Sequence, residues 1–264
     1  MLCGSLRPEI TGSVGAKAAT ELSGLAFSRT QQDVLWTHND SGDRARLLAL
    51  RTNGRLLADV DVPGAQNVDW EDIAAGRGVL FAGDIGDNLG RRPSISVYRI
   101  SEPQVAPGSA AATVSARRIE LRYPDGPRDA EALLLDSASG ALVIVEKRFD
   151  GPAGVYVAAK PSARAPATLR RAGRLSPAVG RGVTAGSVSG DGRTLALRTY
   201  DRVYVWIRKS SESIATALQS PPCVAGEGLI AEGQGEAMAL SATGDAFYTV
   251  PEGTNAAIRR YAPG

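Results

Sequence analysis

A short pattern recurs five times along the chain, in which one polar position is followed by small or apolar residues and then by a turn. The copies begin at intervals of 48, 60, 53 and 52 residues, at Ser23, Glu71, Glu131, Thr184 and Glu236. Each copy leads into a second apolar run, such as residues 79–82 or 142–145, then into a third run and a more polar fourth run. Period-two alternation with β-branched and aromatic residues is typical of β-strands. Four strands in a unit of about 50 residues is the pattern of a β-propeller blade.

The two ends of the chain together amount to one repeat of 51 residues, 28 after Glu236 and 23 up to Ser23. We therefore predict an all-β, five-bladed propeller over residues 1–264, with four antiparallel strands per blade and twenty strands in all. Residues 8–18 are expected as the outer strand of the last blade, because pairing the two ends removes an open sheet edge. Residues 211–219 have some helical character, but the repeat assigns them to a fourth strand. A six-bladed ring is the alternative, and it needs blades of about 44 residues, shorter than the observed intervals.

The polar position of each copy is expected to line the central channel, because the first strand of a propeller blade lies innermost. Three carboxylates that converge on one axis repel one another strongly unless a cation is bound. Carboxylate and hydroxyl oxygens without Cys or nearby His favour a hard ion, Ca²⁺ before Mg²⁺. The predicted metal ligands are therefore Ser23, Glu71, Glu131, Thr184 and Glu236. The alternative is a hydrated channel in which these groups pair with Lys or Arg.

Two of these phrases resemble a known family. Residues 21–25, Glu-Leu-Ser-Gly-Leu, and residues 70–74, Trp-Glu-Asp-Ile-Ala, look like those of calcium-activated nucleotidases of the apyrase type. That family is five-bladed and holds a central Ca²⁺ with a Ser-Glu-Glu-Ser-Glu set, which this chain matches with Thr184 in place of the fourth residue. The chain is also similar to uncharacterised exported propellers of actinobacteria. The resemblance covers the five inner strands and little of the outer ones, so it implies fold and metal more than nucleotide hydrolysis.

Polar clusters follow the predicted second strands, and the repeat places all of them around one mouth of the channel. We interpret them as a ligand-binding face formed by His38, Asn39, Asp40, Asp84, Glu146, Lys147, Arg148, Arg198, Tyr200 and Glu252. Turn chemistry is the alternative, because turns favour Asp, Asn and Gly, and it is the preferred interpretation for Asp43 and Asp87. His38 is the only histidine. It is either structural or a single acid, base or phosphate contact.

Composition and charge exclude several classes of function. The hydrophobic fraction of 43% and the charged fraction of 22% are ordinary for a globular protein. A net charge of +2 gives no electrostatic case for nucleic acid or an anionic membrane. No apolar run approaches the roughly 18 residues of a membrane span. The sequence also has no Cys/His zinc spacing, no Gly-x-Ser-x-Gly elbow and no glycine fingerprint that precedes a helix.

The chain has two cysteines, Cys3 and Cys223. The predicted strand order places both near the outer edges of the fourth and fifth blades, so a disulfide is plausible, and two unrelated thiols are the alternative. A disulfide predicts a secreted or extracytoplasmic protein. No signal peptide is visible at residues 1–4, and a mature chain from which a signal has been removed looks the same.

Three functions remain open from the sequence. The first is a non-catalytic propeller that binds a sugar, a small molecule or a protein partner at the channel mouth, with a mainly structural ion. The second is a Ca²⁺-dependent hydrolase of phosphoric esters or anhydrides, in which Lys147, Arg148 and Arg198 neutralise phosphate while Asp40, Asp84 or Glu146 positions water. The third is a glycosidase with two facing carboxylates. Fold alone does not choose among them.

Overall fold

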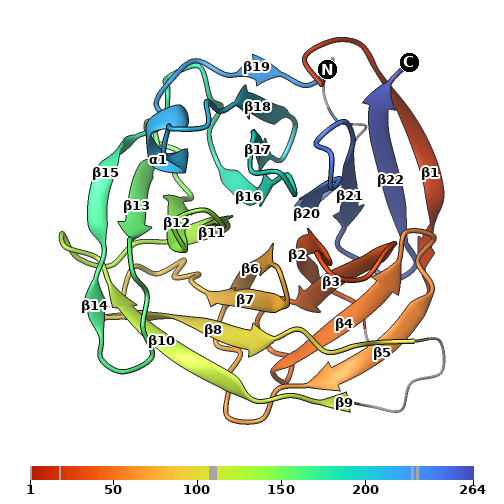
Figure 1. The fold of residues 1–264 in the computed structure, drawn as a ribbon, viewed down its shortest axis with the longest axis horizontal. Helices are drawn as coiled ribbons and strands as arrows, with labels where there is room; N and C mark the ends of the chain where they lie inside the picture. The colour runs from red at the N-terminus through yellow and green to blue at the C-terminus, as the bar shows by residue number, and fades with distance from the viewer. Residues whose placement is uncertain (1, 18, 107–111, 227–228, 230–231) are drawn as a thin grey trace.

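The computed structural model describes residues 2–17, 19–106, 112–226, 229 and 232–264. Their strands form five sheets arranged in a ring (Figure 1). The inner strands each contact the inner strands of both neighbouring blades, which closes the ring. They are β2 (Leu22–Phe27), β6 (Trp70–Gly76), β11 (Ala130–Asp136), β16 (Val183–Val188) and β20 (Gly235–Leu240). The predicted five-bladed propeller is confirmed.

Each blade continues outward from its inner strand in antiparallel order. The first blade adds β3 (Val34–Asn39), β4 (Arg46–Arg51) and β5 (Leu56–Asp61), and the second adds β7 (Val79–Asp84), β8 (Ile95–Ser101) and β10 (Ala116–Arg122). The third adds β12 (Ala141–Glu146), β13 (Gly154–Ala158) and β15 (Arg170–Arg174), and the fourth adds β17 (Thr194–Thr199), β18 (Val203–Ile207) and β19 (Cys223–Val224). The fifth adds β21 (Phe247–Pro251), β22 (Ala256–Pro263) and the N-terminal β1 (Leu6–Val14).

Two connections cross back to the outer edge of the preceding blade. The segment after β8 forms β9 (Ala112–Thr113), which pairs in parallel with β5, and the segment after β13 forms β14 (Ala167–Thr168), which pairs in parallel with β10. These short strands cover part of an exposed sheet edge. They raise the number of described strands from the predicted twenty to twenty-two.

The ring is closed by pairing the two ends of the chain, as predicted. Strand β1 pairs antiparallel with β22, from Leu6 opposite Pro263 to Val14 opposite Ala256, with a bulge between Ile10 and Gly12. The strand begins and ends a few residues earlier than the expected 8–18. Figure 1 shows β1 as the outermost strand of the blade that contains the C-terminus.

The prediction of a strand over residues 211–219 is wrong. These residues contain the short helix α1 (Ile214–Ala217), whose N-cap Ser213 accepts a hydrogen bond from the backbone N–H of Thr216. Capping by serine favours a helix start, and Ile214 and Leu218 are buried in the core cluster of the third and fourth blades. The outer strand of the fourth blade is therefore only Cys223–Val224.

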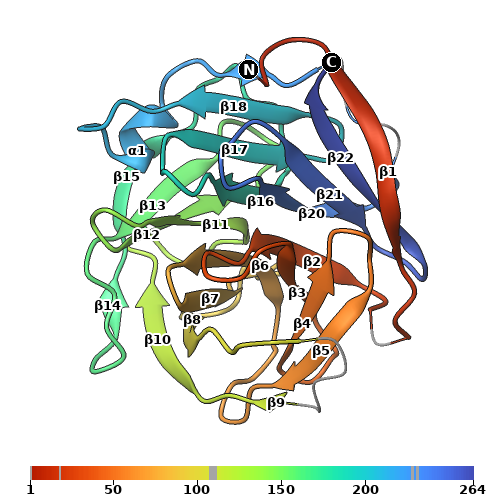
Figure 2. The same ribbon diagram turned by 45° about the vertical axis from the view of Figure 1, so that its right-hand side comes forward.

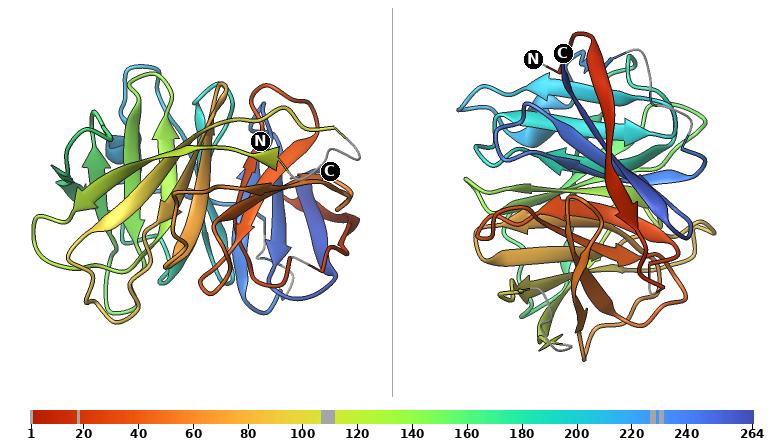
Figure 3. Two further views of the ribbon diagram at one scale, coloured as in Figure 1. Left: turned by 90° about the horizontal axis from the view of Figure 1, so that it is seen from below. Right: turned by 90° about the vertical axis from the view of Figure 1, so that its right-hand side faces the viewer.

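The hydrophobic core lies between neighbouring blades, which pack face to face around the axis (Figures 2 and 3). Between the second and third blades, for example, Val97 and Ile119 pack in one cluster with Leu133 and Ile144. This packing holds the inner strands in register, and so it fixes the positions of the side chains at the channel mouth. Among the residues that the structure describes, no helix has the length and hydropathy needed to cross a membrane.

A disulfide joins Cys3 to Cys223, with 5.5 Å between the Cα atoms. It ties the segment before β1 to the outer strand of the fourth blade, as predicted. Disulfides persist in oxidising compartments, so the bond agrees with an extracytoplasmic location.

Replacing both cysteines with serine should lower the free energy of unfolding by about 2–4 kcal/mol, because the bond closes a loop between residues 220 positions apart. Urea denaturation of the double variant and of the reduced parent protein should give the same midpoint, below that of the oxidised parent. An unchanged midpoint after reduction, with free thiols confirmed by mass, would contradict this expectation.

Candidate metal centre at one end of the channel

The inner strands carry a β-bulge at the same level in every blade. In the second to fifth blades the bulged residue is the predicted polar one, namely Glu71, Glu131, Thr184 or Glu236. A bulge leaves one residue unpaired and redirects its side chain. In four blades out of five, the polar residue of the sequence pattern is therefore the one at which the hydrogen-bond pairing of the inner strand is interrupted.

The first blade is offset by one residue, because its bulged residue is Gly24 and not the predicted Ser23. Gly24 has a φ of +68°, and a Cβ atom there would lie 2.8 Å from His38 Nε2 and 2.9 Å from the Cα atom of Asp72. A side chain at this position would therefore be strained and would clash with the second blade.

The two predicted hydroxyl ligands bind neighbouring backbone. Ser23 Oγ donates to the carbonyl oxygen of Glu71 at 2.6 Å, and Thr184 Oγ1 donates to that of Gly235 at 3.2 Å. Each hydroxyl thus links its inner strand to that of the adjacent blade. A hydroxyl oxygen that donates still has lone pairs for a cation.

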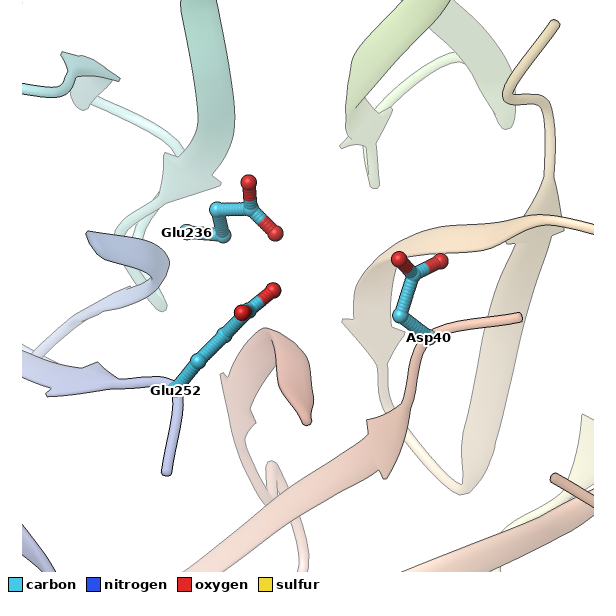
Figure 4. Close-up of side chains that lie close together, drawn as sticks. All are labelled: Asp40, Glu236 and Glu252. Carbon is cyan, nitrogen blue, oxygen red and sulfur yellow. The ribbon is translucent and has the colours of Figure 1, made fainter. Parts of the chain in front are cut away.

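Seven carboxylates gather at the mouth of the channel, and we call them the acidic mouth: Asp40, Asp69, Glu71, Asp129, Glu131, Glu236 and Glu252. They form three triads in which one oxygen from each residue lies within 4.8 Å of the others. The triads are Asp40–Glu236–Glu252, Asp40–Asp69–Glu71 and Glu71–Asp129–Glu131, so Asp40 and Glu71 are each shared by two. Figure 4 shows the first triad, with Asp40 across a gap from Glu236 and Glu252.

Burial and mutual repulsion disfavour the ionised form of the carboxyl groups in the acidic mouth. Burial and, to a smaller extent, the nearby Glu131, Asp40 and Asp69 raise the pKa of Glu71 to about 11. Burial also raises the pKa of Glu252 to about 8 and that of Asp69 to about 6. Carboxylates that repel one another at a shared site favour a bound cation.

In the part of the chain that the structure describes, one basic side chain forms an ion pair with a carboxylate of the acidic mouth. Lys147 forms an ion pair with Oε1 of Glu131, whereas the buried Oε2 has no hydrogen-bond partner. Burial raises the pKa of Glu131 to about 8, although Lys147 acts in the opposite direction. Among the described residues, Glu71 and Glu236 form no ion pair, so pairing with basic groups accounts for only one of the three glutamates. Tyr200 lies beside this pair, with its hydroxyl 3.4 Å from Glu236 Oε1.

Asp69 and Asp129, which complete two of the triads, were not predicted from the sequence. Both stand two residues before an inner-strand glutamate, in Asp69-Trp70-Glu71 and in Asp129-Ala130-Glu131. Gln234-Gly235-Glu236 is the polar equivalent in the fifth blade. This repeated spacing was the available signal.

The glycine-rich loop after β7 makes room for these acids. A Cβ atom at Gly86 would lie 2.2 Å from Glu71 Oε1 and 2.5 Å from Asp69 Oδ2. Only glycine leaves space there for both carboxylates.

Asparagines position the loop that carries Asp40. Asn67 Nδ2 donates to the carbonyl oxygens of Asn39 and Asp40, at 3.2 and 2.7 Å. Asn39 was predicted to bind a ligand at the channel mouth. Its side-chain oxygen accepts hydrogen bonds from the backbone N–H groups of Thr20 and Glu21. Its side-chain nitrogen donates to Asp43. Asn39 is buried and holds the loop in place, and Asp40 Oδ1 is buried without a hydrogen-bond partner.

Two predicted ligand-binding residues are fully buried. His38 packs edge-on against Trp70, with ring centroids 5.4 Å apart, and burial lowers its pKa to about 4. Arg198 pairs with Glu232 at 2.6 Å and donates to the carbonyl oxygen of Ala237 at 3.0 Å. Neither side chain is exposed at the mouth.

The remaining predicted residues of this face are engaged in local contacts. Asp84 pairs with Arg92 at 3.0 Å and accepts from the backbone N–H of Asp69. Glu146 accepts from the backbone N–H of Gly154, and Arg148 pairs with Asp150. Lys147, Arg148 and Arg198 thus each have an acidic partner and do not form a joint cationic cluster.

Asp43 and Asp87, the two acids that were interpreted as turn residues, bond to the backbone of their own loops. Asp87 accepts from the backbone N–H groups of Arg91 and Arg92, at 2.9 and 2.8 Å. Asp43 accepts from the backbone N–H of Arg44 at 2.8 Å and pairs with Arg46.

A further carboxylate below the mouth ties three blades together. Asp72 is fully buried and accepts hydrogen bonds from the backbone N–H groups of Ile73, Leu133 and Gly186, at 2.8, 2.8 and 3.0 Å. These donors lie on the inner strands of the second, third and fourth blades. Asp72 therefore fixes the spacing of the strands that carry Glu71, Glu131 and Thr184.

Comparisons with known proteins give no family. No protein-family model matches the chain, and no curated protein sequence matches it. Among solved structures, the chain is similar to a gluconolactonase from Xanthomonas campestris, at a TM-score of 0.48 and 13% identity over 98% of this chain and 90% of that one. It is also similar to the Swd1 β-propeller domain from Myceliophteria thermophila, at a TM-score of 0.49 and 12% identity over 98% of this chain and all of that one. Likenesses at this level carry no inference about function.

Proposed function

We propose that this chain is a calcium-binding β-propeller in which the ion holds the acidic mouth together and a polar ligand binds at that face. The observation that supports this proposal is the sharing of Glu71 between two carboxylate triads without any basic partner among the described residues. The donors are all oxygens at irregular spacing. Ca²⁺ accepts six to eight such ligands in flexible geometry, whereas Mg²⁺ requires a near-ideal octahedron.

We place the ion beside Glu71, on the side of Asp40 and Asp69. Lys147 already neutralises Glu131, so the triad of Asp40, Asp69 and Glu71 is the more anionic of the two that share Glu71. Asp40 Oδ1 has no other partner. The remaining predicted ligands, Ser23, Glu131, Thr184 and Glu236, stand on the inner strands of the other four blades and are proposed as further ligands of the ion.

The ligand of this face is proposed to be rich in hydroxyl groups rather than in phosphate. The carboxylates of the acidic mouth accept hydrogen bonds from hydroxyl groups, and a bound Ca²⁺ binds hydroxyl oxygens. A phosphate would draw on cationic side chains besides the ion, and Lys147, Arg148 and Arg198 all pair with acids. The pairing removes the specific support for a phosphate hydrolase.

Calcium should bind to EDTA-treated protein and raise its melting temperature. At a hundredfold excess over Kd, binding to the folded state alone stabilises it by about 2.7 kcal/mol, or roughly 5–11 °C for a chain of this size. Isothermal titration calorimetry and thermal melts with CaCl₂ and MgCl₂ measure both quantities. No heat of binding and a melting point insensitive to EDTA would refute the proposal.

Single variants locate the ion. Asp69→Asn should weaken Ca²⁺ binding more than Glu131→Gln, because Lys147 already neutralises Glu131. Glu9→Gln is the control, since Glu9 lies on the outer strand β1 and its side chain is 65% exposed. The opposite order of effects would move the ion to the triad that contains Asp129.

A further inference from the structure

A basic groove lies between the second and third blades, on the face of the ring opposite the acidic mouth. Two adjoining cavities, of about 300 and 420 Å³, share Arg99 and Pro161 in their walls. The larger cavity reaches Arg77 in the turn between β6 and β7. At this end of the hairpin Gly76 pairs with Val79, whereas at the other end, beside Glu71 of the acidic mouth, Trp70 pairs with Asp84. We call the two cavities together the basic groove.

Four arginines line the basic groove, namely Arg77, Arg99, Arg117 and Arg164. All four are exposed and none forms an ion pair with a described residue. No carboxylate is found among the lining residues that the structure describes. The nearby Asp136 is already paired with Arg208 at 3.1 Å. Although the net charge is only +2, acids gather on one face of the ring and these four arginines on the opposite face.

Two of these arginines stand directly opposite each other. Strand β8 pairs with β10, and the facing pairs are Ile95 with Leu121, Val97 with Ile119, and then Arg99 with Arg117. The first two pairs belong to the core between the second and third blades. Like charges in directly opposed cross-strand positions destabilise a sheet. An anion between Arg99 and Arg117 would relieve that repulsion.

The larger cavity adds an apolar wall to this charge. Val79, Phe81 and Leu135 line it beside Arg77 and Arg99. A ligand that fills it therefore needs an apolar group as well as negative charge. The second cavity continues the groove past Arg99 to Arg117 and Arg164.

We propose that the basic groove binds an acidic peptide segment with one apolar side chain. The apolar side chain would rest on Phe81 and Leu135, while flanking carboxylates pair with Arg99 and Arg117. Two open cavities joined at one arginine suit an extended chain better than a compact ligand, because small molecules are usually held in enclosed pockets. Arginine clusters are a recurrent means of binding acidic motifs.

The probe is a fluorescently labelled pentapeptide with a central Phe and two acidic residues on each side. Fluorescence anisotropy should show binding that weakens as salt rises, because the arginines are exposed. Arg99→Gln should weaken binding about tenfold, the range expected for a charge-assisted hydrogen bond. Arg55→Gln is the matched control, since it removes an exposed arginine of the first blade that lines neither cavity.

Two further measurements make the test decisive. Arg99→Gln should leave the melting temperature equal to or above that of the parent, because it removes the repulsion with Arg117. A probe with Gly in place of Phe should bind more weakly than the parent probe. Equal binding by Arg99→Gln and Arg55→Gln would overturn the proposal. So would equal binding of the Phe and Gly probes, or displacement by pyrophosphate at the same concentration as by unlabelled peptide, since the groove would then recognise charge alone.

Discussion

Replacing Glu232 with glutamine is expected to lower the free energy of unfolding by about 3–5 kcal/mol. Glu232 and Arg198 are both fully buried, and their charged groups are 2.6 Å apart. The carboxylate also accepts from Thr249 Oγ1 at 2.6 Å and lies 3.4 Å from Arg259 and from the hydroxyl of Tyr261. Removing its charge leaves the Arg198 guanidinium in the core without an anion, which is among the costliest single changes in a protein.

A double-mutant cycle separates the loss of the pair from the burial of the remaining charge. Glu232→Gln combined with Arg198→Met should cost less than the sum of the two single variants, because no buried charge remains unpaired. Asp201→Asn is the control from the same blade, since its pair with Arg202 is largely exposed, and it should change stability by less than about 1 kcal/mol. Urea denaturation gives all four values. A loss below about 1 kcal/mol for Glu232→Gln would show that Arg198 finds another partner or water.

The pair also bears on the acidic mouth. Arg198 donates to the carbonyl oxygen of Ala237, the residue after Glu236. It therefore links the second strand of the fourth blade to the inner strand of the fifth, next to a candidate ligand. Arg198 was expected from the sequence to contact a ligand. Its side chain instead holds the strand that carries Glu236.

The ring was predictable because a propeller repeats its internal geometry. Four of the five inner strands have a polar residue at the bulge, the first has Ser23 beside it, and all have apolar residues toward both neighbouring blades, so a similar pattern returns at each blade. The closing strand followed from residue count alone. The helix at Ile214–Ala217 did not, because its cap and its buried face depend on the space left beside the third blade.

The candidate site was only partly predictable for a related reason. Glu71, Glu131 and Glu236 occupy equivalent positions, so the repeat identified them. The partners of a charged side chain are set by packing across blades. Among the described residues, the pairs Arg198–Glu232 and Lys147–Glu131 have no counterpart in the other blades. The sequence therefore located five of the seven acids of the acidic mouth, but neither Asp69 and Asp129 nor the acidic partners of Lys147 and Arg198.

Without calcium, the protein should become less stable as the pH rises from 6.5 to 8. The pKa of Glu71 is raised to about 11 in the folded protein, mainly by burial. Its unfolded value is near 4.5, so the folded state keeps a proton that the unfolded chain has released. Stability then falls with pH by about 1.4 kcal/mol per unit for each such group. Over this range Glu71 alone accounts for about 2 kcal/mol, and Glu131 and Glu252, with pKa values raised to about 8, act in the same direction.

The lower limit of the pH range is set by His38. Its pKa is lowered by burial to about 4, so the unfolded chain binds a proton that the folded protein excludes, and stability rises with pH up to about 6.5. Below that value the histidine partly cancels the effect of Glu71. Above it, the contribution of the histidine fades as the unfolded imidazole loses its proton, and by pH 8 the carboxyl groups determine the slope.

Saturating Ca²⁺ should abolish this loss of stability, because a bound cation stabilises the ionised carboxylates in the folded state. Glu71→Gln should reduce the slope without calcium by about 1.4 kcal/mol per pH unit, the share that Glu71 contributes, and should weaken Ca²⁺ binding by about a hundredfold, since it removes the charge that two triads share. Thermal melts at pH 6.5, 7.2 and 8.0, with EDTA or CaCl₂, measure the slopes, and calorimetry measures the affinity. Glu9→Gln should behave as the parent in both. If Glu71→Gln keeps the slope of the parent in EDTA, Glu71 is already ionised in the folded protein, and the repulsion that favours a cation at the acidic mouth must arise elsewhere.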